Sequence, residues 1–388
     1  MCNLYDIVIS NGCVIDTSQA INGIRNVGIN GHKISTVTDK PLNAEFEIDA
    51  TDCLVLPGLI DFHTHLYYGG SEYGLKPDYL LSQGVTAAVD AGTSGSAGFE
   101  SFYHSIILNS SLHIRAFLSI GATGLSDPNH HQNYEYSNIN IKKLKLLKER
   151  YPNQILGLKV AMSKRDVGEL GLQPLRSAIS IAEEIGNLSV CVHSTNPPCD
   201  IENLISEMRP GDILCHCYHG TGSSIIDENN MVKKEILKAR ERGVIFDIAN
   251  GISHCSHKVT QNAIIQKFLP DIISSDIVSF AYGRSKRNKC LPYVMSKMLE
   301  MGMNLNDVVR AVTEVPAKMM HMENQIGTLK SGSWADISIL KLENHNVAYE
   351  DADKEYYYGN KLLVPKMTIR NGQVTFCQID FNNISKAT

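Results

Sequence analysis

Residues 54–70 of the chain read LVLPGLIDFHTHLYYGG, in which an apolar run passes through Pro57 and Gly58 and a second apolar run ends in two histidines. Residues two apart on a β-strand project from the same face, so His63 and His65 would point together into the space that this strand borders. Two imidazoles on one face suit a metal ion. The alternative is a pair of surface histidines or hydrogen-bonded core histidines, and further ligands elsewhere in the chain would decide between the two readings.

More β-rich runs follow this one, and helix-like segments separate them. Two of these segments, SAISIAEEIG ending at Gly186 and MVKKEILKARERG ending at Gly243, have the apolar spacing and charged flanks of amphipathic helices. Eight strands alternating with helices over about 260 residues match the size of an eight-stranded α/β barrel. The sequence therefore predicts an α/β fold, a (β/α)8 TIM-type barrel over residues 57–325, with strands at Leu59–His65, Val85–Ala91, Ile114–Ile120, Ile155–Val160, Leu188–His193, Ile213–His216, Val244–Ile248 and Ile272–Asp276.

The two ends of the chain have a different sequence pattern, with short β-rich runs separated by turn signals. Such runs occur between Tyr5 and Val55 and again in GSWADISILKL and KMTIRNGQVTF near the other end. The Asn-Gly pairs at residues 11–12 and 30–31 are hairpin signals. We expect one small β-sandwich built from residues 1–56 and 326–380, followed by a frayed tail over residues 381–388.

The composition is that of a globular protein, and it argues against several classes of partner. The 36 Lys and Arg against 41 Asp and Glu give a formal charge of −5, without a basic stripe that would track phosphates. We expect no nucleic-acid partner, no membrane association and a cytoplasmic location, because the chain shows no leader pattern and no apolar run of about 18 residues. The ten cysteines form no Cys-x-x-Cys pair and are expected to be reduced core residues.

Polar residues recur where the predicted strands end, which is where a barrel of this kind carries its chemistry. Lys159 lies inside the apolar run ILGLKVAMS, where an unpaired ammonium would be costly. His193 and His216 end two later strands, and Asp276 ends the eighth. Each has an ordinary alternative role, as a hydrogen-bonded core residue or a helix cap. Together with the two opening histidines they are hard to obtain by chance, and the whole set predicts a metal site.

This pattern resembles the amidohydrolase superfamily, and most closely the deacetylase branch of its dihydroorotase-like members. The resemblance rests on PGLIDFHTH, on the strand-end Lys, His and Asp, and on GVTAAVDAGTSG, RPGDILCHCYHG, RGVIFDIANG and LPDIISSD. It implies two divalent metal ions, expected to be Zn²⁺, with His63, His65 and Asp276 as ligands of the more buried ion and His193 and His216 as ligands of the more exposed one. Lys159 would bridge both as a carbamate, formed when its neutral amine captures carbon dioxide.

The same resemblance implies an activity. A metal-bridging hydroxide would attack an amide or ester carbonyl, and Asp276 would take the proton and deliver it to the departing nitrogen. We expect a small-molecule deacylase, a deacetylase acting on an N-acyl or O-acyl substrate. Two alternatives stay open: opening of a cyclic amide, as in dihydroorotase-like and dihydropyrimidinase-like relatives, and a non-catalytic scaffold, which the intact ligand positions argue against. Homo-oligomerisation is also left open.

Substrate contacts are expected in the loops at the carboxyl ends of the strands, where the sequence of this chain differs from that of typical relatives. The loops after the fourth and eighth strands, VAMSKR and IVSFAYGRSKRNK, are both basic. We expect Arg284 to pair with a substrate carboxylate, and the alternative is that these charges are only solvated. His219 is either a substrate contact or a residue that orients its loop. His254 and His257, in HCSH, are expected to lie in a loop without binding metal.

Overall fold

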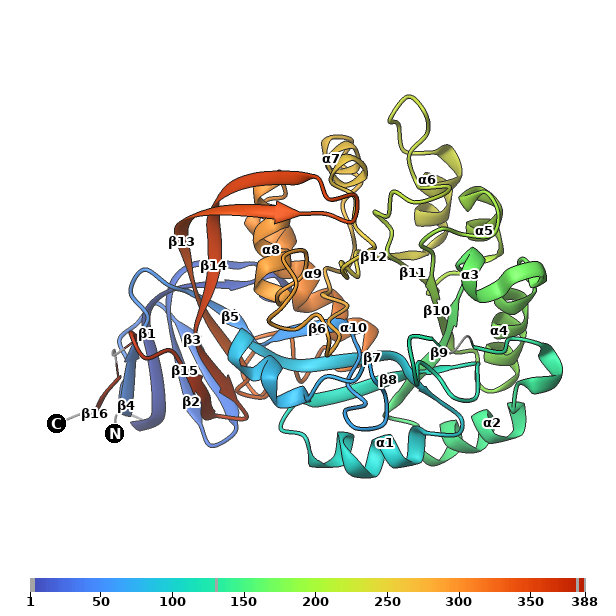
Figure 1. The fold of residues 1–388 in the computed structure, drawn as a ribbon. Coiled ribbons are helices and arrows are strands. Elements are labelled where there is room, and N and C mark those ends of the chain that lie inside the picture. Colours follow the sequence, from blue (N-terminus) through green and yellow to red (C-terminus); the bar gives the residue numbers. More distant parts are fainter. Residues whose placement is uncertain (1–3, 130–131, 382–383, 387–388) are drawn as a thin grey trace.

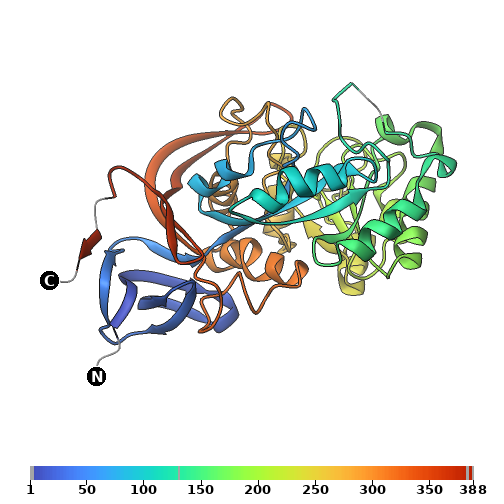
Figure 2. The same ribbon diagram turned by 90° about the horizontal axis from the view of Figure 1, so that it is seen from below.

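A computed structural model describes residues 4–129, 132–381 and 384–386 of the chain. Two β-sheets organise these residues: a curled parallel sheet built from the middle of the chain, and a second sheet built from both of its ends (Figure 1). The blue N-terminal strands and the red C-terminal strands lie together on one side, and the parallel sheet with its green helices lies on the other. The view from below in Figure 2 shows the same division.

The parallel sheet contains seven strands in the order β12-β11-β10-β9-β8-β7-β6, so each strand lies beside the one that precedes it along the chain. Every residue of β6, β7 and β9 is buried, as expected for parallel strands that are covered on both faces. The strands are β6 Leu59–Thr64, β7 Val85–Gly95, β8 His113–Ser119, β9 Ile155–Ala161, β10 Ser189–His193, β11 Ile213–Cys215 and β12 Ile245–Asp247.

The eighth predicted strand, Ile272–Asp276, is present only as a segment with isolated pairings between β12 and β6. Its parallel bridges join Ile272 with Asp247 and Ile277 with Thr64. Asp276 donates its N–H to the His63 carbonyl at 2.7 Å. Its φ of 50° is left-handed and interrupts an extended strand. The fold is thus an α/β fold with a curled parallel sheet, in which the eighth position lacks a continuous strand.

The second sheet joins strands from both ends of the chain, as the sequence predicts. β5 pairs with β1 in parallel and with β13 in antiparallel orientation, so the C-terminal strands continue the N-terminal ones. The main path runs β15-β14-β13-β5-β1-β2-β3, and β4 and β16 lie off this path. The strands are β1 Leu4–Asp16, β2 Ile21–Asn30, β3 Lys33–Thr38, β4 Asn43–Asp49, β5 Leu54–Pro57, β13 Ile337–Glu350, β14 Tyr356–Arg370, β15 Gln373–Cys377 and β16 Ile384–Lys386.

The two Asn-Gly pairs in this sheet have different structures. The pair at residues 30–31 forms the predicted hairpin between β2 and β3. The hairpin predicted at residues 11–12 is wrong, because this pair lies inside β1, where the register with β2 shifts between Ile9 and Gly12. Asn11 has a φ of 61°. A bulge and a tight turn can use the same left-handed backbone, which is why the two share a sequence signal.

The end of the chain also differs from the expected frayed tail. Ile384–Lys386 forms β16 and pairs antiparallel with β4. Residues 382–383 and 387–388, which the same expectation covered, lie outside the described residues. Part of the tail therefore belongs to the second sheet.

Gly58 joins the two sheets, because it separates β5 from β6. A Cβ atom at this position would lie 2.1 Å from Thr86 Oγ1, so only glycine fits without a shift of β7. The Gly58 N–H donates to the Asp336 carbonyl at 2.7 Å, and Ser338 Oγ accepts from the Leu59 N–H at 3.1 Å. Residues of the C-terminal strands therefore anchor the start of β6.

Helices cover the outer face of the parallel sheet and include the two predicted ones. α4, Gln173–Glu184, packs on β9 and β10, and α6, Lys234–Arg242, ends at the left-handed Gly243. The other α-helices are α1 Phe99–Ser105, α2 Ile141–Arg150, α3 Lys164–Val167, α5 Ile201–Glu207, α7 His257–Ile265, α8 Leu291–Glu300, α9 Leu305–Val312 and α10 Glu314–Met319. Among the described residues, no helix has both the length and the apolar character needed to cross a membrane.

Candidate metal-binding site

A cavity of about 420 Å³ lies at the carboxyl ends of the parallel strands. Its lining includes all the residues that the sequence predicts as metal ligands: His63, His65, Lys159, His193, His216 and Asp276. They come from β6 and the residue after it, from β9 and β10, from the residue after β11 and from the segment at the eighth position. The fold therefore brings the whole predicted set to one place.

One group of donors consists of His63, His65 and Asp276. Their candidate ligand atoms lie within 4.8 Å of one another. Asp276 Oδ1 is 3.1 Å from His65 Nε2 and 3.8 Å from His63 Nε2, and all three residues are buried. Two imidazole nitrogens and a carboxylate at these distances form a donor set that suits a divalent ion such as Zn²⁺.

Neighbouring residues hold the other ring nitrogen of each of these histidines. His63 Nδ1 lies 3.2 Å from Asp247 Oδ2, and His65 Nδ1 lies 2.8 Å from Thr93 Oγ1. Such contacts fix the ring orientation and leave Nε2 as the free donor atom toward Asp276. Burial raises the pKa of Asp247 to about 8, and a cation on the far side of the His63 ring would favour the charged carboxylate. The sequence prediction did not include Asp247, although its motif RGVIFDIANG contains it.

The second group consists of His193, His216 and His254, whose candidate ligand atoms also lie within 4.8 Å of one another. The His216 ring centroid is 4.3 Å from that of His193 and 4.1 Å from that of His254. His216 Nδ1 lies 2.7 Å from the Ala249 carbonyl oxygen, so Nδ1 carries the hydrogen and Nε2 is the free acceptor. His193 and His254 are only half-buried, so this group is more exposed than the first.

The structure brings His254 into this group, whereas the sequence prediction left it in a loop without a ligand role. The loop lies between β12 and α7, and His254 lines the cavity. Its Nδ1 is 2.9 Å from Thr195 Oγ1, and its Nε2 is 3.8 Å from Asp276 Oδ2. A Cβ atom on Gly251 would lie 2.5 Å from the His254 ring and 2.6 Å from Asp276 Oδ2. Glycine at this position therefore lets the loop approach the site.

Lys159 points into the cavity from β9. Its Nζ lies 3.3 Å from His63 Nε2 and 3.5 Å from Cys191 Sγ, and the residue is only 6% exposed. In the part of the chain that the structure describes, no carboxylate forms an ion pair with it. A buried ammonium without a carboxylate partner is costly, and chemical modification of the amine would remove this cost.

Burial keeps four histidines of the cavity neutral. It lowers the pKa of His63, His193 and His216 well below the ordinary value for histidine, and it also lowers the pKa of His254. A neutral imidazole offers a lone pair to a cation, whereas an imidazolium does not. These four imidazoles are therefore in the protonation state that divalent metal ions require.

Asp61, the carboxylate of PGLIDFHTH, holds the segment that carries Asp276. Its Oδ1 accepts the Ser275 N–H at 2.9 Å, and the Ser275 hydroxyl donates to its Oδ2. Burial raises the pKa of Asp61 to about 7. Because Ser275 directly precedes Asp276, these bonds help to fix the left-handed backbone that aims Asp276 at the histidines.

The two predicted substrate contacts are not among the residues that line the cavity. Arg284 is exposed in the loop before α8. His219 is buried, and its Nδ1 donates to the Thr221 carbonyl at 3.0 Å, which supports the role of orienting its own loop. Arg165, from the other basic loop, lines the cavity instead. Its guanidinium donates to the Pro128 carbonyl at 2.8 Å.

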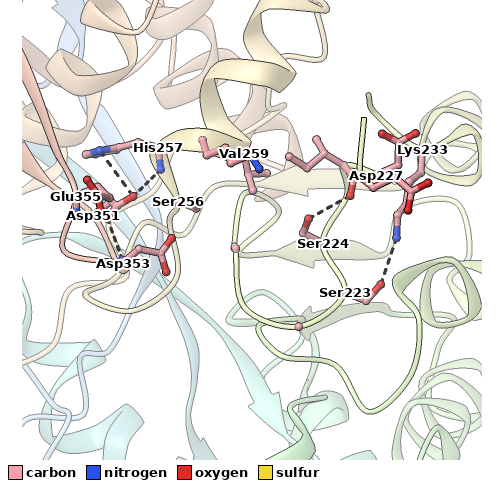
Figure 3. Close-up of a pocket in the computed structure, with 15 residues that line it drawn as sticks. Ser223, Ser224, Asp227, Lys233, Ser256, His257, Val259, Asp351, Asp353 and Glu355 are labelled. Atoms are coloured by element: carbon pink, nitrogen blue, oxygen red, sulfur yellow. Dashed lines mark hydrogen bonds and ion pairs between the residues drawn. The ribbon is translucent and has the colours of Figure 1, made fainter. Parts of the chain in front are cut away.

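A second hollow, of about 610 Å³, is larger than the cavity but has a different lining. In Figure 3, Asp351, Asp353 and Glu355 lie on one side of it, and Ser223 and Lys233 lie on the other. Within the described residues, the groups of candidate metal ligands lie elsewhere. We therefore assign the candidate site to the smaller cavity.

The fold and this cavity define a class of protein: hydrolases with a curled parallel sheet that carries histidine and carboxylate donors at the carboxyl ends of its strands. A model of the amidohydrolase family matches residues 54–375, and the chain belongs to this family. It is therefore an enzyme, a hydrolase that acts on carbon–nitrogen bonds.

Similar proteins share the fold but differ in their named substrates. The chain is 30% identical over 327 residues to "Deacetylase Atu3266" of Agrobacterium fabrum, covering 83% of this chain and 79% of that protein. It is 26% identical over 378 residues to a deacetylase of Enterococcus faecalis, covering 95% and 99%. Among solved structures it resembles an adenine deaminase (TM-score 0.86, 26% identity, 96% and 100% covered) and a dihydroorotase (TM-score 0.85, 28% identity, 96% and 98% covered).

Proposed function

We propose that the chain is a binuclear metal-dependent amidohydrolase that removes the acyl group, in the simplest case an acetyl group, from a small N-acyl or O-acyl substrate. The observation that carries this proposal is the convergence of the two donor groups on one cavity beside Lys159. The similarity to named deacetylases over most of the chain supports the choice of an acyl substrate.

In this proposal the parallel sheet acts as a (β/α)8 barrel, with residues 272–277 at the eighth position, beside a small β-sandwich made from both chain ends. The bridges from Ile272 and Ile277 to the strands on either side support the closure. A barrel explains why the donors meet, because the carboxyl ends of all its strands open at one mouth.

The donor set fits two divalent ions, and Zn²⁺ is our choice because neutral imidazoles dominate it. Divalent ions bound there would supply Lewis acidity, which lowers the pKa of water and polarises a carbonyl group. His63, His65 and Asp276 would hold one ion, and His193 and His216 the other. Lys159 as a carbamate would place an anion beside both groups, which removes the cost of a buried ammonium. His254 would complete the second group or contact the substrate.

Asp276 is the proposed proton carrier. Its Oδ1 faces His63 and His65, while its Oδ2 faces His254, so one carboxylate reaches both halves of the cavity. It would accept a proton from the attacking water and then donate that proton to the departing nitrogen. This sequence of transfers is what hydrolysis of an amide requires.

A substrate screen tests the proposal. The metal-loaded enzyme would be assayed with N-acetyl amino acids, acyl esters and cyclic amides, alongside an Asp276→Asn variant with measured metal content. We expect turnover of linear acyl compounds by the parent enzyme. Turnover of cyclic amides alone would replace the proposal with a ring-opening hydrolase. A purified protein that holds no metal and turns over none of these substrates would support a scaffold.

A further inference from the structure

Two cysteines lie side by side in the interior of the parallel sheet, next to the candidate site. Cys191 is on β10 and Cys215 is on β11, and their sulfur atoms are 3.1 Å apart. Both residues are buried, at 2% and 0% exposure. A ring nitrogen of His63 lies within 4.8 Å of both sulfurs. The proposed hydrolysis uses neither thiol.

The register of the two strands makes a disulfide an unsuitable product of this pair. Cys191 lies opposite Ile213 and Cys215 lies opposite His193, so the two cysteines are offset by two residues. With strands about 4.8 Å apart and a rise of about 3.3 Å per residue, their Cα atoms would be about 8 Å apart. Disulfides need a Cα separation below about 7 Å. A metal ion between two sulfurs spans a wider gap, because each sulfur–metal bond adds about 2.3 Å.

We propose that His63, Cys191 and Cys215 form a binding site for one soft, thiophilic divalent ion, which overlaps the first donor group at His63. Two thiolates and an imidazole are the ligand types that soft and borderline ions prefer over hard ones. Binding replaces two sulfur–hydrogen bonds by two sulfur–metal bonds and releases two protons, so charge and atoms balance without an oxidant.

The cavity gives this site its entrance. His63 and Lys159 line the cavity, and Lys159 Nζ is 3.5 Å from Cys191 Sγ. An ion that enters past Lys159 would thus meet Cys191 first. Once bound, it would take His63 away from Asp276 and inhibit the enzyme. This inhibition rests on the proposed function, whereas the binding itself does not.

Cadmium titration tests the binding directly. The purified enzyme with its resident metals would carry Cys377→Ser, which removes the one exposed thiol among the described residues. It would be titrated with Cd²⁺ while the ultraviolet thiolate-to-cadmium charge-transfer absorption is followed. We expect the absorption to saturate near one equivalent, because one ion fills the site. Cys191→Ser and Cys215→Ser should each abolish tight uptake, since a single thiolate remains. Cys53→Ser, which changes a buried cysteine of the second sheet, should keep it.

The possible results separate the two proposals. Full absorption in Cys191→Ser or Cys215→Ser, or its absence from the parent, would overturn the soft-metal site. Alanine replacements at the same positions, checked by thermal unfolding, would show whether a lost band reflects a lost ligand or a misfolded chain. Failure of the substrate screen would overturn the proposed hydrolase and leave the absorption result standing, because the absorption needs no substrate.

Discussion

Asp276 combines a strained backbone with the only carboxylate of the two donor groups. We predict that Asp276→Asn lowers kcat far more than it changes KM, because a proton carrier acts mainly in the transition state. Positioned proton transfer contributes roughly 10²–10⁴-fold to turnover. Steady-state kinetics with matched metal content measure the loss, and activity within a factor of about three of the parent would remove Asp276 from the mechanism.

Lys159 is a buried amine among imidazoles and thiols, and its proposed carbamate can be tested separately from turnover. We predict that Lys159→Ala loses bound metal in elemental analysis, because the anionic bridge is gone. A short carboxylic acid such as acetate should restore part of the metal and activity, since it can occupy the vacated space. Intact-mass or crystallographic evidence for a bare lysine in a fully metal-loaded parent would contradict the bridge.

His219 makes a prediction about pH. Burial lowers its pKa from 6.5 to about 4. Between these pH values the unfolded chain binds a proton at His219 that the folded chain does not bind, so the free energy of unfolding falls as the pH drops from about 6.5 toward 4. At pH 5 this single group should cost about 2 kcal/mol. His219→Asn keeps a donor for the Thr221 carbonyl but does not titrate. Urea denaturation at pH 7 and pH 5 should therefore show a smaller loss for the variant, and equal losses would refute the assignment.

At the scale of elements, the short helix α3 determines which arginine can contact a substrate. Arg165 lines the cavity, and among the described residues no carboxylate forms an ion pair with it, whereas Arg284 lies outside the lining. We predict that Arg165→Ala lowers kcat/KM for an acidic N-acyl substrate by roughly 10- to 150-fold, the range for a hydrogen bond to a charged group, and much less for its neutral amide. Arg284→Ala is the matched control. Equal losses for both substrates would place carboxylate recognition elsewhere.

The elements also show what the sequence could and could not predict. His63, His193 and Lys159 could be placed because apolar runs define strands, and strands of a parallel sheet end on one side. His254 lies in a loop and Arg165 in the short helix α3 that follows β9, and the course of both segments depends on packing and on glycine positions that no periodicity encodes. A continuous eighth strand was predicted because its apolar run resembles the others. The left-handed backbone of Asp276 cannot be read from the hydrophobic pattern of the sequence.

On the scale of the whole molecule, the two sheets should unfold together. Ser338 of β13 accepts from the Leu59 N–H and donates to the Gly84 carbonyl, and the single tryptophan, Trp334, stacks on His113 of β8 at a centroid distance of 4.0 Å. We predict that Ser338→Ala costs roughly 0.5–1.5 kcal/mol, because the Leu59 N–H and the Gly84 carbonyl lose the hydroxyl but keep their bond to each other.

Guanidinium unfolding followed by tryptophan fluorescence and by circular dichroism measures this effect. The two probes should give one midpoint in the parent and a lower common midpoint in Ser338→Ala. Ser82→Ala, at an exposed position, should stay within about 0.5 kcal/mol of the parent. A tryptophan transition that separates from the dichroism transition would show that the sheets unfold independently.

The pairing of β5 with β13 has a consequence for synthesis on the ribosome. β5 ends at Pro57, but its antiparallel partner begins only at Ile337. At about 5–20 residues per second, the ribosome needs roughly 15–55 s to supply that partner. During this interval the apolar edge of β5 is open to pairing with other nascent chains. Newly made molecules should therefore depend on holdase chaperones, and slower translation before residue 337 should increase aggregation in cells.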